Sequence, residues 1–139
     1  MKDLTGSSSE QWQELWLLMA QLQAAEPTEL VKFQGGEQRE DGMFVMPWAS
    51  YDATVNRIEE LLYDLNVVQD VDWSGWQSAI NPDLLFDAER IKSGTLYDTV
   101  CMLTGIIRSE RFGSDAIATS LENGGFLASL ARLESLVSA

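Results

Sequence analysis

Two arginines three positions apart, Arg108 and Arg111, are the side chains best suited to binding chemistry in this sequence. Such a pair either grips a carboxylate or phosphate ligand through parallel hydrogen bonds or forms an ion pair within the fold. The pair follows an apolar stripe at helical spacing, which consists of Leu96, Val100, Leu103 and Ile107. Arg111 continues this stripe, so we expect it to face the core and to pair with Asp72. Arg108 lies at the flank, where it is better placed to bind an anion, but the structural ion pair is the favoured interpretation.

The motif that runs from Asp72 through Trp73 to Trp76 is the second candidate. We interpret it as a capping carboxylate followed by two core tryptophans, because tryptophan is largely buried on average. If the indoles are exposed, they form a stacking platform or an interaction hot spot instead. Residues 70–81 also match the first positions of an EF-hand calcium loop, but Asn81 replaces the glutamate that binds calcium through both oxygens. No metal site is therefore predicted.

Catalysis has few candidate groups, because the 139 residues include no histidine. This removes the commonest general base, the usual zinc ligand and every histidine-dependent triad. Cys101 lies in the middle of an apolar segment with no cationic neighbour in sequence, and we expect a buried, inert thiol. Carboxylate or tyrosine chemistry at residues such as Tyr51 stays open. We predict no catalytic residue and no cofactor, and a binding protein is favoured over an enzyme.

Helices must position these side chains. Apolar periodicity and capping residues predict a mainly α fold, a compact bundle of about six helices in a single domain over residues 1–139. The predicted helices span residues 7–27, 50–65, 81–94, 95–113, 114–124 and 126–137, with a short helical turn at Trp73 to Trp76. The predicted N-terminal caps are Ser7, Ser50, Asn81, Thr95 and Ser114.

Residues 31–48 break the helical pattern. The stretches VKFQ and MFVMPW flank the polar GGEQREDG, which predicts at most a minor β-hairpin with an eight-residue loop, or else an irregular loop. Pro47 restricts any second strand to an edge or to its own end. A loop as long as Gly35–Gly42 is either mobile or functional.

Charge narrows the choice of partners. The net charge is -13, and residues 1–87 hold 16 acidic against 4 basic side chains. This balance disfavours nucleic acid and anionic membranes as partners, and leaves open a protein partner with a basic surface. The single cysteine excludes an intramolecular disulfide, and the first residues lack the apolar core of a signal peptide, so we expect a cytoplasmic location. The oligomeric state is left open.

Several motifs follow one another in a recognisable order. They are Met46–Tyr51, Asp72–Trp76 (DW..W), Leu103–Phe112 (ending R.ERF), Leu121–Gly124 and Leu130–Leu133. This order resembles an uncharacterised bacterial family, one of the domains of unknown function. The similarity covers residues 43–133 and leaves the first helix out, and it departs from the family at Val71 and at an early glycine after Phe112. The resemblance implies a helical domain and no assigned activity.

We therefore favour a non-enzymatic bacterial protein that functions by binding another macromolecule. A first alternative is a small-anion or nucleotide-binding protein, enzymes included, that uses Arg108 and Arg111. A second alternative is an acidic decoy that mimics nucleic acid. The decoy requires surface carboxylates arrayed along one face, whereas scattered carboxylates need no explanation beyond solubility.

Overall fold

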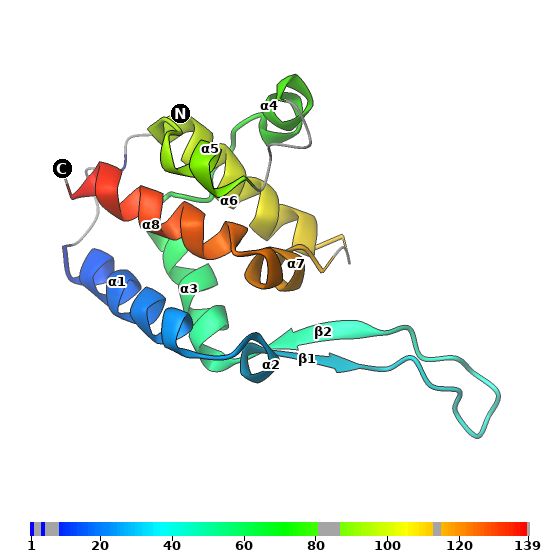
Figure 1. Ribbon diagram of the computed structural model, residues 1–139. Helices are drawn as coiled ribbons and strands as arrows, with labels where there is room; N and C mark the ends of the chain where they lie inside the picture. Colours follow the sequence, from blue (N-terminus) through cyan, green and yellow to red (C-terminus); the bar gives the residue numbers. More distant parts are fainter. Residues whose placement is uncertain (2–3, 5–8, 81–86, 113–114, 139) are drawn as a thin grey trace.

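The computed structural model describes residues 1, 4, 9–80, 87–112 and 115–138. These residues contain eight helices and one two-stranded antiparallel sheet (Figure 1). The elements are α1 (Ser9–Ala24), α2 (Pro27–Leu30), β1 (Val31–Gln34), β2 (Trp48–Tyr51), α3 (Ala53–Asp64), α4 (Trp73–Ala79), α5 (Ala88–Lys92), α6 (Leu96–Glu110), α7 (Ala116–Asn123) and α8 (Gly125–Val137). The mainly α fold with a minor hairpin is confirmed. The predicted turn at Trp73 is α4, and the single turn α2 was not predicted.

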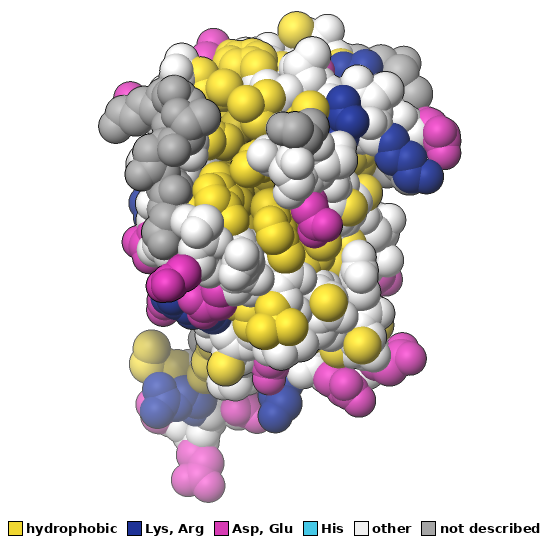
Figure 2. Space-filling view, turned by 90° about the vertical axis from the view of Figure 1, so that its left-hand side faces the viewer, with side chains coloured by type: hydrophobic (Ala, Val, Ile, Leu, Met, Phe, Trp, Pro, Cys, Tyr) yellow, Lys and Arg dark blue, Asp and Glu magenta, His cyan; other side chains and the backbone are white. Residues whose placement is uncertain are grey.

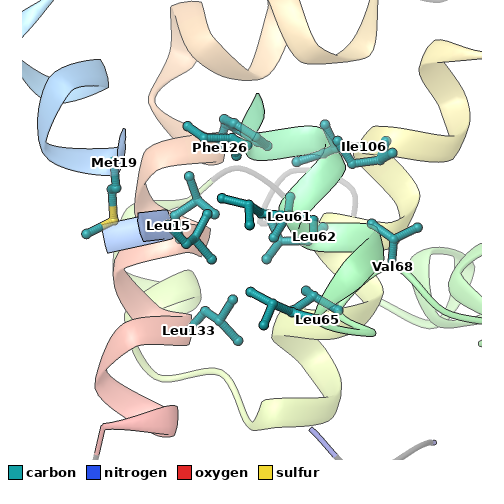
Figure 3. Close-up of a cluster of buried hydrophobic side chains, with 14 of the residues drawn as sticks. Leu15, Met19, Leu61, Leu62, Leu65, Val68, Ile106, Phe126 and Leu133 are labelled. Atoms are coloured by element: carbon teal, nitrogen blue, oxygen red, sulfur yellow. The ribbon is translucent and has the colours of Figure 1, made fainter. Parts of the chain in front are cut away.

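Helix α6 lies at the centre of the helical body, packed against α8, α4 and α7, while α1 packs against α3 and α8. Every residue from Thr99 to Thr104 is buried, so α6 is enclosed all round instead of burying one stripe. Figure 3 shows leucines of α3 meeting Leu15 of α1 and Phe126 of α8 in the core beside it. The apolar stripe therefore does not tell which residues at the end of α6 face inward.

Side-chain caps explain where α3 and α6 begin. The Asp52 carboxylate accepts a hydrogen bond from the Thr54 amide at 3.1 Å, so α3 starts after Asp52. The predicted cap Ser50 is wrong, because Ser50 lies in β2. At α6 the predicted cap is confirmed, since Thr95 and Asp98 each accept from the other's backbone amide in a capping box.

The remaining predicted caps, Ser7, Asn81 and Ser114, lie outside the described residues. Helix α5 follows Asp87, whose carboxylate accepts from the Glu89 amide at 2.9 Å. Helix α7 follows Asp115, which has left-handed backbone angles and makes no side-chain cap. The amides at the start of α7 must therefore find acceptors elsewhere.

The hairpin is longer than its two strands. β1 and β2 pair from Val31 opposite Tyr51 to Gln34 opposite Trp48. Pairing then resumes in the same register, with Gln38 opposite Phe44 and further backbone hydrogen bonds out to residues 39 and 43. The segment GGEQREDG, predicted as a loop, is thus part of a two-stranded arm, residues 31–51, that projects from the helical body (Figure 1).

Two glycines set the geometry of the arm. At its tip Gly42 has a φ of 85° and donates to the Arg39 carbonyl at 2.9 Å, which closes a three-residue hairpin turn with glycine in the left-handed position. Gly35 has a φ of 81°, and a Cβ there would collide with the Met46 carbonyl. The close approach of the two chains at this point therefore requires glycine.

We predict that Leu103→Ala destabilises the protein by about 2–5 kcal/mol, because Leu103 is fully buried in α6 and its truncation leaves a cavity. Leu17→Ala is the matched control, since Leu17 is 62% exposed on α1. Urea denaturation followed by circular dichroism measures both. Equal losses of stability in the two variants would contradict the placement of α6 at the centre of the core.

Candidate functional site

The two arginines that were predicted to act together have different neighbours. Arg111 is the C-cap residue of α6 and is exposed, and its guanidinium carbon lies 5.2 Å from the centre of the Tyr63 ring on α3. This is cation–π geometry. Arg111 forms no ion pair with Asp72, although both residues are described, so the predicted Arg111–Asp72 pair is wrong. Arg111 lies after the last buried turn of α6. Because the middle of α6 is buried on all sides, its apolar stripe does not predict whether a residue at this position faces the core.

Arg108, the arginine at the flank of the stripe, forms the ion pair. Its Nη1 lies 3.8 Å from Oδ1 of Asp70, with the side chains 33% and 99% exposed. The pair joins α6 to the segment ahead of the tryptophans, as the structural interpretation requires, but through different residues. Because Asp70 is almost fully in water, such a pair contributes only about 0–1 kcal/mol. Among the described residues the buried Nε of Arg108 has no hydrogen-bond partner, and anion binding by the two arginines stays a prediction.

Tyr51, the last residue of β2, lies against the end of α6 and the start of α7. Its hydroxyl donates to Oε1 of Glu110 and accepts from the Ala118 amide at 3.2 Å. The other Glu110 oxygen accepts from the Ile117 amide at 3.2 Å. Tyr51 and Glu110 thus supply the acceptors that Asp115 does not offer to the first turn of α7. The glutamate of the R.ERF motif is a helix cap that sequence reasoning missed.

This contact also decides what Tyr51 can do chemically. Burial, followed by the hydrogen bond to Glu110 and the charge of that carboxylate, raises the pKa of Tyr51 far above its ordinary value of 10.0. The phenol therefore stays neutral and donates its proton to Glu110. With its proton donated to Glu110 and its oxygen accepting from the Ala118 amide, the phenol links β2 to the ends of α6 and α7.

Glu59 on α3 belongs to the same charged end of the bundle. Burial, and next the nearby charge of Glu110, raise the pKa of Glu59, whereas the positive charge of Arg111 opposes this shift. Arg111 therefore offsets part of the repulsion between the two glutamates. The position of Arg111 over Tyr63 places its positive charge where it acts on Glu59, an interaction that the predicted pairing with Asp72 did not include.

Asp72 caps α4, as predicted, by accepting from the Gly75 amide at 3.0 Å. Trp73 and Trp76 are half-buried, so they are neither core residues nor a freely exposed platform. Trp73 packs on Gly105 of α6, where a Cβ would lie 3.2 Å from the indole ring. Both tryptophans line an open groove of about 260 Å³ between α4, α6 and α7. This volume exceeds the ~150 Å³ of an apolar cavity that binds benzene.

Trp76 is held in place by Asp98. The indole Nε1 donates to Oδ1 of Asp98 at 2.9 Å, while Oδ2 accepts from the Thr95 amide at 3.0 Å. Burial opposes ionisation of this carboxyl, but the hydrogen bonds from Trp76 and Thr95 outweigh it and lower the pKa of Asp98. The sequence identifies Asp98 as a cap, but its spacing from Trp76 gives no signal of their contact.

The remaining chemical groups are Cys101 and the acidic side chains. Cys101 is fully buried, and burial is the largest cause that raises the pKa of its thiol, so an inert thiol is the supported interpretation. Among the described residues no group of three or more acidic or cysteine side chains could hold a metal ion. No helix in the described part of the chain has the length and apolar character needed to cross a membrane.

The surface carboxylates bear on the decoy hypothesis. On the face shown in Figure 2, acidic side chains are scattered around an apolar centre and do not form a row. Basic side chains lie among them at the edges of the same face. A nucleic acid mimic needs an ordered array of negative charge, so this face lends the decoy hypothesis no support.

The described residues form a mainly α domain that carries a projecting hairpin. The sequence matches the model of a family of unknown function, DUF6508, over residues 7–139, and the chain belongs to this family. The resemblance noted in the sequence is thereby confirmed, and the match extends to the first helix. No curated protein and no solved structure matches the sequence.

We predict that Tyr51→Phe destabilises the fold by about 1–3 kcal/mol, because it leaves the Ala118 amide without an acceptor and Glu110 without a donor. Tyr63→Phe is the matched control. The buried Tyr63 hydroxyl has no hydrogen-bond partner among the described residues, so its loss is expected to be neutral or slightly stabilising. Urea denaturation of both variants tests this difference, and equal effects would rule out the capping role of Tyr51.

We also predict that Glu59→Gln raises the melting temperature near neutral pH. The folded-state pKa of Glu59 lies above the ordinary value of 4.5, so the fold binds this proton more tightly than the unfolded chain does. Ionised Glu59 therefore costs stability, and this cost appears as the pH rises through the folded pKa and vanishes below the unfolded pKa. Thermal melts should show a gain that disappears in acid. Glu40→Gln, at the tip of the arm, should give a smaller gain at neutral pH, and a gain from Glu59→Gln that persisted in acid would refute the explanation.

Proposed function

We propose that this chain is a protein-binding module whose docking element is the hairpin arm, residues 31–51. Phe44, Met46 and Trp48 occupy every second position of the returning chain of the arm, with Phe44 opposite Gln38 and Trp48 opposite Gln34. They are 58%, 72% and 46% exposed, and this row of large apolar side chains is the observation that carries the proposal. The residues paired with Phe44 and Trp48, which are Gln38 and Gln34, are uncharged.

The arm offers binding energy at low entropic cost. Burying one side chain of this size contributes about 1.5–3 kcal/mol when it starts fully exposed. With roughly half of each side chain still exposed, the row can contribute about 2–4 kcal/mol, which is comparable to a binding hot spot. The backbone ladder already fixes the arm out to its tip, so little ordering remains to be done on binding.

Charge indicates the chemistry of the partner. The chain carries a net charge of -13, and Glu37, Glu40 and Asp41 surround Arg39 near the tip of the arm. A second copy of the chain would bring the same negative charge and be repelled. A different protein, with an apolar groove and a basic rim, would be attracted at long range and would cover the row on contact. We therefore assign the arm to such a partner.

We predict that a photo-crosslinking amino acid in place of Phe44 captures one partner in cells, whereas the same substitution at Leu17 on α1 does not. The captured protein is then purified, and its affinity for the unmodified chain is measured by titration calorimetry. A Phe44→Ser, Met46→Ser double variant should bind at least tenfold more weakly, since about 1.4 kcal/mol of apolar contact corresponds to a factor of ten. Binding should also weaken with salt.

The control is Leu17→Ser, which removes an exposed apolar side chain from the helical body and should leave the affinity unchanged. Circular dichroism of the double variant should equal that of the original chain, because the altered side chains contribute little to the core. A crosslink between two copies of the chain would contradict a separate partner. A captured protein that binds the double variant equally well would refute the docking role of the arm.

A further inference from the structure

The open groove between α4, α6 and α7 has room for a small molecule. Its volume is about 260 Å³, which is larger than the ~150 Å³ of an apolar cavity that holds one benzene ring. Trp73 and Trp76 line it on the α4 side, and both side chains are half-buried. Met102 and Ile106 line it on the α6 side. A molecule in the groove would therefore meet two aromatic rings and an apolar wall.

Two carboxylates act on this groove from beside the tryptophans. Asp98 accepts from the Trp76 indole N–H at 2.9 Å, and Asp72 caps α4 immediately before Trp73. Burial contributes most to the raised pKa of the Cys101 thiol in the groove wall, and the charges of Asp98 and Asp72 raise it further. Both carboxylates therefore contribute a negative potential at the wall of the groove.

Two arginines lie near acidic residues of this region, but the described lining of the groove includes neither arginine nor lysine. Arg108, which precedes the lining residue Ser109, is paired with Asp70 at 3.8 Å. Arg90 acts on Asp98 and helps to lower the pKa of that carboxyl. The groove thus favours a cationic ligand over an anionic one.

The hydrogen bond between Trp76 and Asp98 adds to this preference. A carboxylate that accepts an indole N–H polarises the ring, which makes the face of the ring more negative. Tryptophan is the aromatic side chain that attracts cations most strongly through its face. A quaternary ammonium group carries methyl groups in place of N–H donors, so it needs no hydrogen-bond acceptor when it leaves water. Such a group suits a wall of indole rings and apolar side chains.

We propose that this groove binds a small quaternary ammonium compound such as free choline, with its trimethylammonium group against Trp73 and Trp76. Choline is only slightly larger than benzene, so the groove has room for it. Gln77 and Thr119, both exposed, line the groove and offer polar groups to the choline hydroxyl. This proposal does not depend on the function of the arm.

The test is a titration of the full-length protein, followed by the NMR resonances of the tryptophan indole N–H groups. Choline should shift those of Trp73 and Trp76 saturably and leave that of Trp48, an exposed tryptophan of the arm, unchanged. The uncharged analogue of choline, in which carbon replaces the nitrogen, should bind about fivefold more weakly, because it keeps the shape and lacks the cation–π attraction. Phosphocholine should also bind more weakly than choline, because its phosphate is repelled.

Two variants separate the contribution of charge from that of the rings. Asp72→Asn keeps an oxygen that caps α4 but removes the charge, so it should weaken choline about two- to threefold and leave the uncharged analogue unaffected. Glu29→Gln removes the same charge from α2, at the opposite end of the molecule from α4 (Figure 1), and should change neither affinity. Trp73→Leu keeps an apolar side chain and should reduce the preference for choline over its analogue.

Folding is checked independently of binding. Because asparagine caps a helix about as well as aspartate, the melting temperature of Asp72→Asn should match that of the original chain. The comparison of choline with its uncharged analogue is made on the original chain and needs no variant. Equal affinities for these two compounds would overturn the choice of a cation. Absence of a saturable shift at Trp73 and Trp76, or an equal shift at Trp48, would overturn the groove as the binding site.

Discussion

The enclosure of α6 is the constraint on which the rest of this structure depends. Its residues from Thr99 to Thr104 are all buried, and α8, α4 and α7 each pack against it. Where large side chains surround a helix, any neighbour that comes close needs a small residue, and Gly105 supplies this space for Trp73. The groove lined by Trp73 and Trp76 lies where α4 meets α6.

The ends of α6 carry the polar interactions that its middle excludes. At the first turn Asp98 completes the capping box and holds the Trp76 indole. At the last turn Glu110 caps the following helix together with Tyr51. Each carboxylate thus serves a second element besides its own helix. Asp98 thereby connects α6 to α4, and Glu110 connects α6 to α7 and to the base of the arm.

Much of the fold could be predicted from the sequence, because helix periodicity and capping residues are local signals. The capping box at Thr95 and the cap at Asp72 are confirmed, and so is the family resemblance. The ion pair was assigned to the wrong residues, since a stripe of apolar residues locates the core only for a helix with one buried face. The contacts of Glu110 with Tyr51 and of Asp98 with Trp76 join distant parts of the chain, and spacing in one sequence carries no information on them.

The residue that ends β2 has a mechanical consequence. Because the Tyr51 side chain is fixed between Glu110 and the start of α7, and the Asp52 amide donates to the Leu30 carbonyl, the root of the ribbon cannot swivel freely. The chain that leaves this root takes eight residue steps from Val31 to Arg39, which would span about 26 Å if it were fully extended at ~3.3 Å per residue. These contacts of Tyr51 therefore hold the base of the arm against the end of α6 and the start of α7.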